Sequence, residues 1–258
     1  MYKIFDTHAH YDDEQFDIDR DELLNSMVAA GIEHVVNMGA SMRGCKDTLS
    51  LVEKYPFLYG AIGIHPDEVG ELTEEDYKWL ELNCTAEKIV AIGEIGLDYY
   101  WDTVDHATQK EWFVRQMNLA REKKLPIVVH SRDAAADTYD IMKAEHAGDI
   151  GGVVHCYSYT KEMARQFMEM DFYFGFGGVL TFSNAKKAKE AAEYIPMNRI
   201  VIETDAPYLS PVPNRGKRNS SLNLPYVIKT LAEIKGLSEE EICNQTYENA
   251  LRLYRIQK

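Results

Sequence analysis

Short apolar runs alternate with longer amphipathic segments along the chain, and this alternation is typical of βα units that build a parallel sheet. Eight runs are rich in Val, Ile, Tyr and Phe and nearly continuously apolar, as expected for strands that are buried on both faces. These predicted strands are residues 3–6, 34–38, 58–64, 89–94, 126–130, 152–155, 172–177 and 200–204. Eight successive units predict either a closed (β/α)8 barrel or a long open sheet.

Amphipathic segments that fit helices lie between the predicted strands, and two more follow the last strand. Examples of these predicted helices are residues 19–30, 73–83, 107–123, 134–146, 161–170 and 185–194, and the two that follow the last strand are residues 222–235 and 239–254. Thr73, followed by Glu75 and Asp76, is typical of a capped helix start. Apart from the βα alternation, no linker, low-complexity run or internal repeat interrupts the series. We therefore expect residues 1–258 to form a single domain with extra C-terminal helices.

Composition places the chain among globular proteins, because 45% of its residues are hydrophobic. No apolar stretch approaches the roughly 20 residues of a membrane helix, and residues 1–6 lead into a strand instead of a signal peptide. We therefore expect a cytoplasmic protein with no membrane contact. The four cysteines are far apart and are expected to be free thiols. A net charge of −14 argues against a broad surface that tracks phosphates, so any contact with nucleic acid must be local.

Polar residues at the ends of the predicted strands favour the closed barrel. Five of the eight histidines follow apolar runs, where a barrel has its active-site face: His8, His10, His65, His130 and His155. Glu94 and Asp205 occupy the equivalent positions on the fourth and eighth strands. Side chains two residues apart on a strand point the same way, so His8 and His10 form a convergent pair. In a closed barrel all these strand ends point toward one axis.

A lone histidine after a strand is more often a hydrogen-bonded core residue than a metal ligand. Four imidazoles and two carboxylates buried together would leave charges unpaired, however, and a metal resolves this. The predicted ligands are His8, His10, Glu94, His130, His155 and Asp205. Six exceed the three or four protein ligands of one catalytic zinc, which predicts two divalent cations. Glu94 is the predicted bridge between a site with His8, His10 and Asp205 and a site with His130 and His155.

Three segments closely resemble the signatures of the TatD-type metal-dependent DNases: IFDTHAH at 4–10, PIVVHSR at 126–132 and IETDAP at 202–207. Segments 63–66, 93–99 and 214–219 also resemble the family, in the same order, so the resemblance spans the whole chain. It implies a TIM barrel of the amidohydrolase type, two divalent cations on the six residues above, and DNase activity. Tyr159 and Ala136 depart from the family pattern, and neither is a predicted ligand. The cations could be Zn, Mn, Fe, Ni or Mg, because mixed imidazole and carboxylate ligands do not fix the metal.

Further residues could bind substrate or support the ligands. The substrate-binding candidates are His65, Arg132, Arg215, Lys217 and Arg218, of which the last three form the densest basic loop. This loop could neutralise a phosphate or could equally be a solvated loop, and His65 could equally be structural. Glu203 and Asp6 should point inward one layer deeper, where they could orient an imidazole or be ordinary buried polar groups.

Aromatic residues occupy the loops after the fourth and sixth strands, where bases could stack, although loop packing is the more frequent role. They are Tyr99, Tyr100, Trp101, Tyr157 and Tyr159.

The predicted reaction is hydrolysis of a phosphodiester in DNA, at single-stranded ends, with Asp205 and Glu94 as catalytic residues. Asp205 would orient the attacking hydroxide and accept its proton. Hydrolysis of a carboxyl ester, lactone or amide is the alternative among enzymes, because the same barrel type hosts both chemistries. A metal-binding scaffold is the alternative that is not an enzyme. DNA is the expected partner, and no obligate protein partner is predicted.

Overall fold

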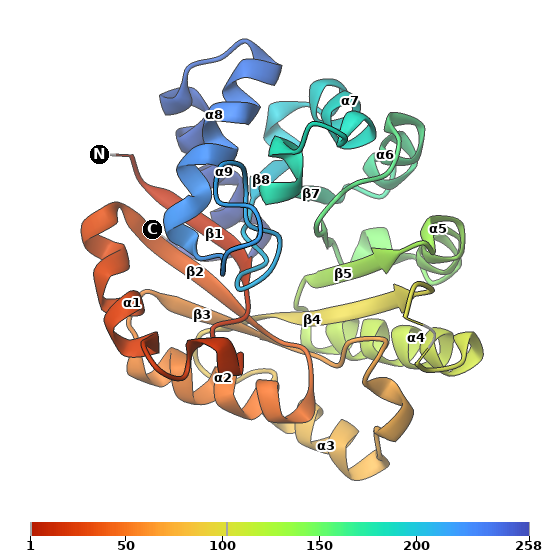
Figure 1. Cartoon of the computed structure of the whole chain (residues 1–258). Coiled ribbons are helices and arrows are strands. Elements are labelled where there is room, and N and C mark those ends of the chain that lie inside the picture. The colour runs from red at the N-terminus through yellow and green to blue at the C-terminus, as the bar shows by residue number, and fades with distance from the viewer. Residues whose placement is uncertain (1, 102, 258) are drawn as a thin grey trace.

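The structure, a computed structural model, describes residues 2–101 and 103–257, and its eight strands form one parallel sheet in chain order (Figure 1). The strands are β1 (Ile4–Ala9), β2 (Ile32–Gly39), β3 (Leu58–Ile62), β4 (Ile89–Asp98), β5 (Ile127–Arg132), β6 (Gly152–Val154), β7 (Tyr173–Phe176) and β8 (Ile200–Ile202). Each overlaps one predicted strand, which confirms the predicted number and order. The predicted ends were wrong for β1, β4 and β5, which continue to Ala9, Asp98 and Arg132, and for β3 and β8, which end at Ile62 and Ile202.

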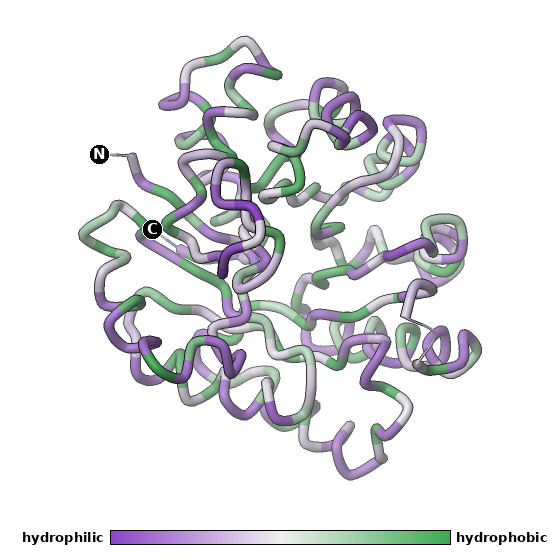
Figure 2. Tube along the Cα trace, viewed as in Figure 1, coloured by the Kyte–Doolittle hydropathy of each residue, from purple (hydrophilic) through white to green (hydrophobic). Residues whose placement is uncertain are grey.

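Helices follow the strands and surround the sheet (Figure 1). They are α1 (Arg20–Met27), α2 (Met42–Lys54), α3 (Glu74–Asn83), α4 (His106–Lys123), α5 (Ala135–Ala144), α6 (Lys161–Met168), α7 (Lys186–Tyr194), α8 (Leu224–Lys235) and α9 (Glu239–Leu253). Thr73 caps α3 through a reciprocal pair of bonds with Asp76, as the sequence predicts. Helix α2 lies between β2 and β3, where the βα alternation predicts a helix. Along the peripheral helices, hydrophobic and hydrophilic positions alternate, as in amphipathic helices (Figure 2).

Backbone hydrogen bonds join β1 to the segment that follows β8. The amide of Asp205 donates to the carbonyl of His8 over 2.9 Å, and the amide of His10 donates to the carbonyl of Ala206 over 2.7 Å. A parallel bridge between Ala9 and Ala206 lies between them. The eight strands therefore form a nearly closed barrel, and this confirms the barrel over the open sheet.

The core has two parts. A large cluster fills the space between the sheet and the helices, and a smaller one fills the inside of the barrel. The inner cluster comprises Phe5, Val36, Met38, Ala61, Ala91, Val128, Val153 and Val201 from the strands, and Ala250, Leu251, Leu253 and Tyr254 at the end of α9. Val128 and His130 share strand parity on β5, so this apolar floor lies one layer below the polar groups. The barrel interior is therefore packed, and its chemistry is confined to the carboxyl end.

Within the described residues, no helix is both long enough and apolar enough to span a membrane.

Candidate active site

All six predicted ligands meet at the carboxyl end of the barrel. His8, Glu94 and His130 lie within β1, β4 and β5, whereas His10, His155 and Asp205 follow β1, β6 and β8. His8 was expected to follow the first strand and instead lies within it, because β1 is longer than predicted, whereas His130 lies within its strand as predicted. A cavity of about 670 Å³ opens over the group, and five of the six ligands line it. His8 lies beneath them, fully buried.

The two carboxylate oxygens of Glu94 face different pairs of histidines. Its Oε1 lies 2.6 Å from His130 Nδ1 and 2.6 Å from His155 Nε2. Its Oε2 lies 3.2 Å from His8 Nε2 and 3.7 Å from His10 Nε2. The ligand atoms of Glu94, His130 and His155 all lie within 4.8 Å of one another, and so do those of His8, His10 and Glu94. Each oxygen of this one carboxylate therefore belongs to its own ligand group.

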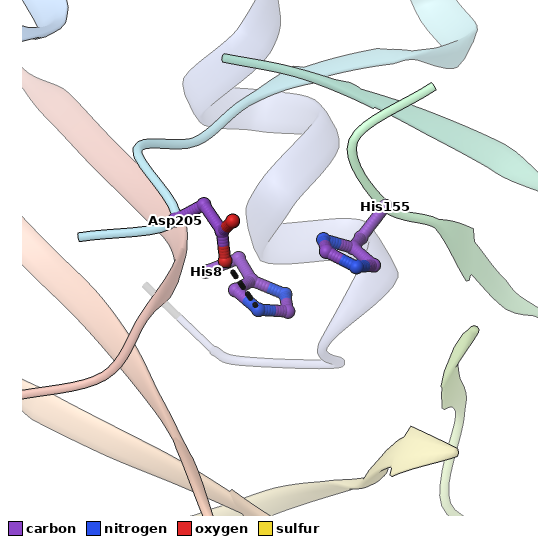
Figure 3. A group of neighbouring side chains, drawn as sticks. All are labelled: His8, His155 and Asp205. Carbon is purple, nitrogen blue, oxygen red and sulfur yellow. Dashed lines mark ion pairs between the residues drawn. The ribbon is translucent and has the colours of Figure 1, made fainter. Parts of the chain in front are cut away.

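Asp205 completes the group around His8 and His10. Its Oδ1 lies 3.4 Å from Nε2 of each of these two imidazoles. Figure 3 shows the Asp205 carboxylate directed at the His8 ring, with His155 alongside. The His8 and His155 rings are stacked, with centroids 4.1 Å apart and planes 11° apart. The two ligand groups are therefore in direct contact.

Ring nitrogens face one another inside the site, and this arrangement fits a bound cation. His8 Nε2 and His10 Nε2 are 3.1 Å apart, and His130 Nδ1 and His155 Nε2 are 3.2 Å apart. The Nδ1–H of His10 donates to the carbonyl of Met38 over 2.9 Å, so its Nε2 presents a lone pair to the site. Lone pairs of imidazoles and carboxylates that converge in this way match the ligands of divalent transition metals.

Both carboxylates are held in the ionised form. Burial alone would raise the pKa of Glu94, but the nearby imidazoles outweigh it and hold this pKa well below its ordinary value. Burial also acts to raise the pKa of Asp205, and the hydrogen bond with His10 outweighs it and lowers this pKa. The site therefore has two negative charges available for cations.

The backbone at Asp205 is in the left-handed region, with φ of 58°. Asp is one of the few residues with a side chain that adopts this conformation. The side-chain amide of Asn219 holds the turn, because it donates to the carbonyls of Thr204 over 2.9 Å and Tyr208 over 2.8 Å. A buried amide from the next segment thus fixes the direction of the Asp205 carboxylate.

The match to known proteins extends along almost all of the chain. The model of the family described as TatD related DNase matches residues 5–255. The chain belongs to the TatD-related DNase family. Over 253 residues it is 46% identical to the uncharacterized metal-dependent hydrolase YabD of Bacillus subtilis (strain 168), with 98% of this chain and 99% of that protein covered. The family match and this relative together show that the present chain is a metal-dependent hydrolase of the TatD family. The predicted family and enzyme class are therefore confirmed.

Two further relatives support the assignment. The TatD-family protein is 30% identical to the 3′-5′ ssDNA/RNA exonuclease TatD of Cronobacter sakazakii (strain ATCC BAA-894), with 97% of each chain covered. The crystal structure of YjjV, a TatD homologue from Escherichia coli K12, matches with a TM-score of 0.92 and 27% identity, and 98% of each chain is covered. The predicted TIM barrel is confirmed by this likeness.

The two predicted supporting carboxylates have different surroundings in this TatD-family protein. Glu203 Oε1 lies 3.6 Å from His155 Nδ1 and accepts a hydrogen bond from the amide of Cys156. Glu203 therefore lies beside that imidazole at a distance longer than a hydrogen bond, and its orienting role stays a prediction. Asp6 accepts hydrogen bonds from Thr204 Oγ1 and Ser221 Oγ, each over 2.6 Å, and these ties run from β1 to the segments after β8. This matches the alternative of a satisfied buried polar group.

Of the five predicted substrate-binding residues, His65 and Arg132 line the cavity of the TatD-family protein. His65 Nδ1 accepts a hydrogen bond from the amide of Asp67, and its Nε2 lies 4.0 Å from Glu94 Oε1. Burial lowers the pKa of His65 to about 3, so this imidazole is neutral and its Nε2–H points toward Glu94.

The basic loop lies outside that cavity. Arg215, Lys217 and Arg218 line a separate groove with Tyr208 and Leu209, and these last two residues also line the cavity. Arg218 pairs with Asp19 over 2.5 Å and donates to the carbonyl of Gln15, so it ties this loop to the start of α1. The substrate-binding role of Arg218 stays a prediction, and the contacts of Arg218 are those of a residue that holds two loops together.

Asp98 is the functional candidate that the sequence analysis left without a role. Its Oδ2 lies 2.9 Å from His130 Nε2, so the imidazole donates that N–H and turns Nδ1 toward Glu94. Asp98 and Glu94 share strand parity, and this would have identified Asp98 if the strand had been predicted to continue beyond Glu94. β4 continues because Gly96, with φ of 148°, lacks a Cβ that would lie 1.9 Å from the carbonyl oxygen of His130.

Acidic side chains line the cavity mouth on the side of β1 and β3. Asp12 and Asp13 follow β1, and Asp67 and Glu68 follow β3. Among the described residues that line the cavity, Arg132 is the one arginine, and there is no lysine. Electrostatic repulsion at this rim disfavours a long polyanion that crosses it.

Proposed function

We propose that this TatD-family protein hydrolyses phosphodiester bonds in nucleic acid with two divalent cations, and that it removes nucleotides from single-stranded ends. The observation that supports this most strongly is the position of Glu94, whose two oxygens face two separate ligand groups at 2.6 Å and 3.2 Å. A carboxylate shared in this way is typical of two-metal hydrolases of phosphate esters. The exonuclease name of the Cronobacter sakazakii relative supports the substrate class.

Each group has the ligands for one cation. His8, His10, Asp205 and Glu94 Oε2 would hold one, and His130, His155 and Glu94 Oε1 would hold the other. Bound divalent cations lower the pKa of coordinated water and neutralise charge that develops on phosphoryl oxygens. Glu203 and Asp98 would orient the second group, because each lies against one of its imidazoles.

Asp205 is the proposed proton acceptor. Its carboxylate lines the cavity, is held ionised, and has its direction fixed by the turn that Asn219 clamps. A carboxylate in this position orients the attacking nucleophile and takes up its proton. His65 would donate its Nε2–H from the opposite wall, and the Arg132 guanidinium would bind the phosphate of the scissile nucleotide.

The charge distribution supports chain ends as substrates. The acidic rim of Asp12, Asp13, Asp67 and Glu68 opposes continuous backbone on one side of the cavity. A terminal nucleotide brings few phosphates, and Arg132 can bind one of them. The basic loop lies in the neighbouring groove, and there Arg215 and Lys217 would contact phosphates further along the strand.

The test is an assay of the protein reconstituted with Mn²⁺ or Zn²⁺ on end-labelled single-stranded DNA, the matching blunt duplex, and a p-nitrophenyl carboxyl ester. We expect stepwise shortening of the single strand, slower action on the duplex, and no turnover by Glu94→Ala. Glu68→Ala, which removes a carboxylate at the rim of the same cavity, is the matched control and should stay active. Turnover of the ester with intact DNA would replace this proposal with the carbonyl alternative.

A further inference from the structure

An exposed group of two aromatic rings and a guanidinium lies at the mouth of the cavity. Tyr100 and Trp101 follow β4, and their rings meet edge to face with centroids 4.9 Å apart. Arg132 ends β5, and its guanidinium lies 3.9 Å from the Tyr100 ring centroid and 5.4 Å from that of Trp101. The aromatic residues are 54% and 57% exposed, so most of their ring surface is left for a ligand.

The other aromatic residues that the sequence singled out pack internally. Tyr99 stacks on His106 and donates its hydroxyl to Asp137. Tyr157 is buried, and the Tyr159 hydroxyl donates to the carbonyl of Ser131 over 2.9 Å. Loop packing therefore accounts for these three, and it does not account for Tyr100 and Trp101.

Asp98 fixes the aromatic pair relative to the predicted metal ligands. Its Oδ1 accepts hydrogen bonds from the amides of Tyr100 over 2.8 Å and Trp101 over 3.2 Å, while its Oδ2 contacts His130 Nε2. Gln109 holds Asp98 itself, because its amide group bonds both the N–H and the carbonyl of that residue over 2.9 Å. One carboxylate thus positions an imidazole of the site and the backbone that carries the two rings.

We propose that Trp101 and Arg132 form a nucleobase subsite, in which the base of the terminal nucleotide stacks on Trp101 while the Arg132 guanidinium binds its phosphate. Both residues line the cavity that contains Glu94 and Asp205, and Tyr100 supports the guanidinium from outside it. An aromatic face beside a planar cation matches a base and its phosphate, whereas the loops after β1 and β3 bring acidic residues to the same cavity. The subsite rests on the proposed nucleic-acid substrate and gives a reason for single strands, because a paired base is not free to stack.

The kinetic test compares two single-stranded oligonucleotides that differ in the terminal nucleotide, one with its base and one abasic. Loss of one stacked base lowers affinity by roughly tenfold to a hundredfold. We therefore expect the native enzyme to show a KM about tenfold lower for the complete substrate. Trp101→Ala should remove that difference through KM, Trp101→Phe should keep most of it, and kcat should change little. Tyr194→Ala, which removes a similarly exposed ring on α7, is the matched control.

A binding test separates this inference from the proposed reaction. The chain has three tryptophans, and Trp101 is exposed whereas Trp79 is half-buried and Trp112 is buried. A single-stranded phosphorothioate oligonucleotide should quench the fluorescence of the metal-loaded native protein, and Trp101→Phe should lose this quenching. Quenching without cleavage of any phosphodiester would support the subsite and overturn the proposed reaction. The subsite would be overturned if Trp101→Ala cleaved both substrates and kept the native difference in KM between the complete and the abasic end.

Discussion

Replacing Glu94 by glutamine removes the carboxylate that the two ligand groups share and keeps the size of the side chain. Without it, the group of His130 and His155 has two imidazoles left, which is fewer than the three protein ligands of a catalytic zinc site. The other group still has His8, His10 and Asp205. If the native protein binds two cations as proposed, we expect Glu94→Gln to bind one cation per chain.

The magnitude follows from the linkage between binding and folding. A cation at 100 times its dissociation constant stabilises the folded state by about 2.7 kcal/mol. A change of 1 kcal/mol shifts the melting temperature of a domain somewhat smaller than this chain by about 2–4 °C. The lost cation should therefore lower the melting temperature in saturating metal by roughly 5–11 °C.

The measurement is metal content by inductively coupled plasma mass spectrometry after dialysis, together with calorimetric melting in saturating Mn²⁺ or Zn²⁺. Glu68→Gln makes the same chemical change at the exposed rim of the cavity and should keep both cations and the native melting temperature. If Glu94→Gln retained two cations, Glu94 would not be the bridge. If Glu94→Gln retained no cation, the group of His8, His10 and Asp205 would not bind a cation without Glu94.

Three other changes test the site. Asp205→Asn should lower kcat by roughly 10²- to 10⁴-fold with an unchanged circular dichroism spectrum, because it removes the proton acceptor; full activity would exclude Asp205 from the mechanism. Asn219→Ala leaves the carbonyls of Thr204 and Tyr208 without a donor and should cost about 1–3 kcal/mol in urea unfolding, and an unchanged midpoint would show that the clamp is dispensable. Excess chelator should lower the melting temperature and added cation should restore it; melting that ignores both would argue against any resident metal.

The convergence of the six predicted ligands could be predicted because it depends on two simple rules of strand geometry. Parallel strands place their carboxyl ends at one edge, and residues two apart on a strand share a face. Those rules placed His8, Glu94 and Asp205 together although they lie far apart in the chain. They required only an approximate end for each strand.

Strand ends and loop contacts could not be predicted from the same rules. Asp98 was left without a role because the apolar run of β4 stops before it, and the strand continues only through the close approach at Gly96. The partner of Arg218 in the basic loop could not be predicted either, because Arg218 pairs with Asp19, 199 residues away. Such partners are chosen by tertiary packing, which a single sequence does not reveal.

Closure of the barrel between its first and last strands also bears on synthesis of the protein. Asp6 bonds Thr204 across 198 residues, and the amide of Asp205 bonds the carbonyl of His8. A nascent chain that has not yet emerged beyond β8 therefore lacks Asp205 and the bonds that hold the His8–His10 pair in place. The predicted ligand group of His8, His10 and Asp205 can therefore assemble only after the segment that follows β8 has paired with β1.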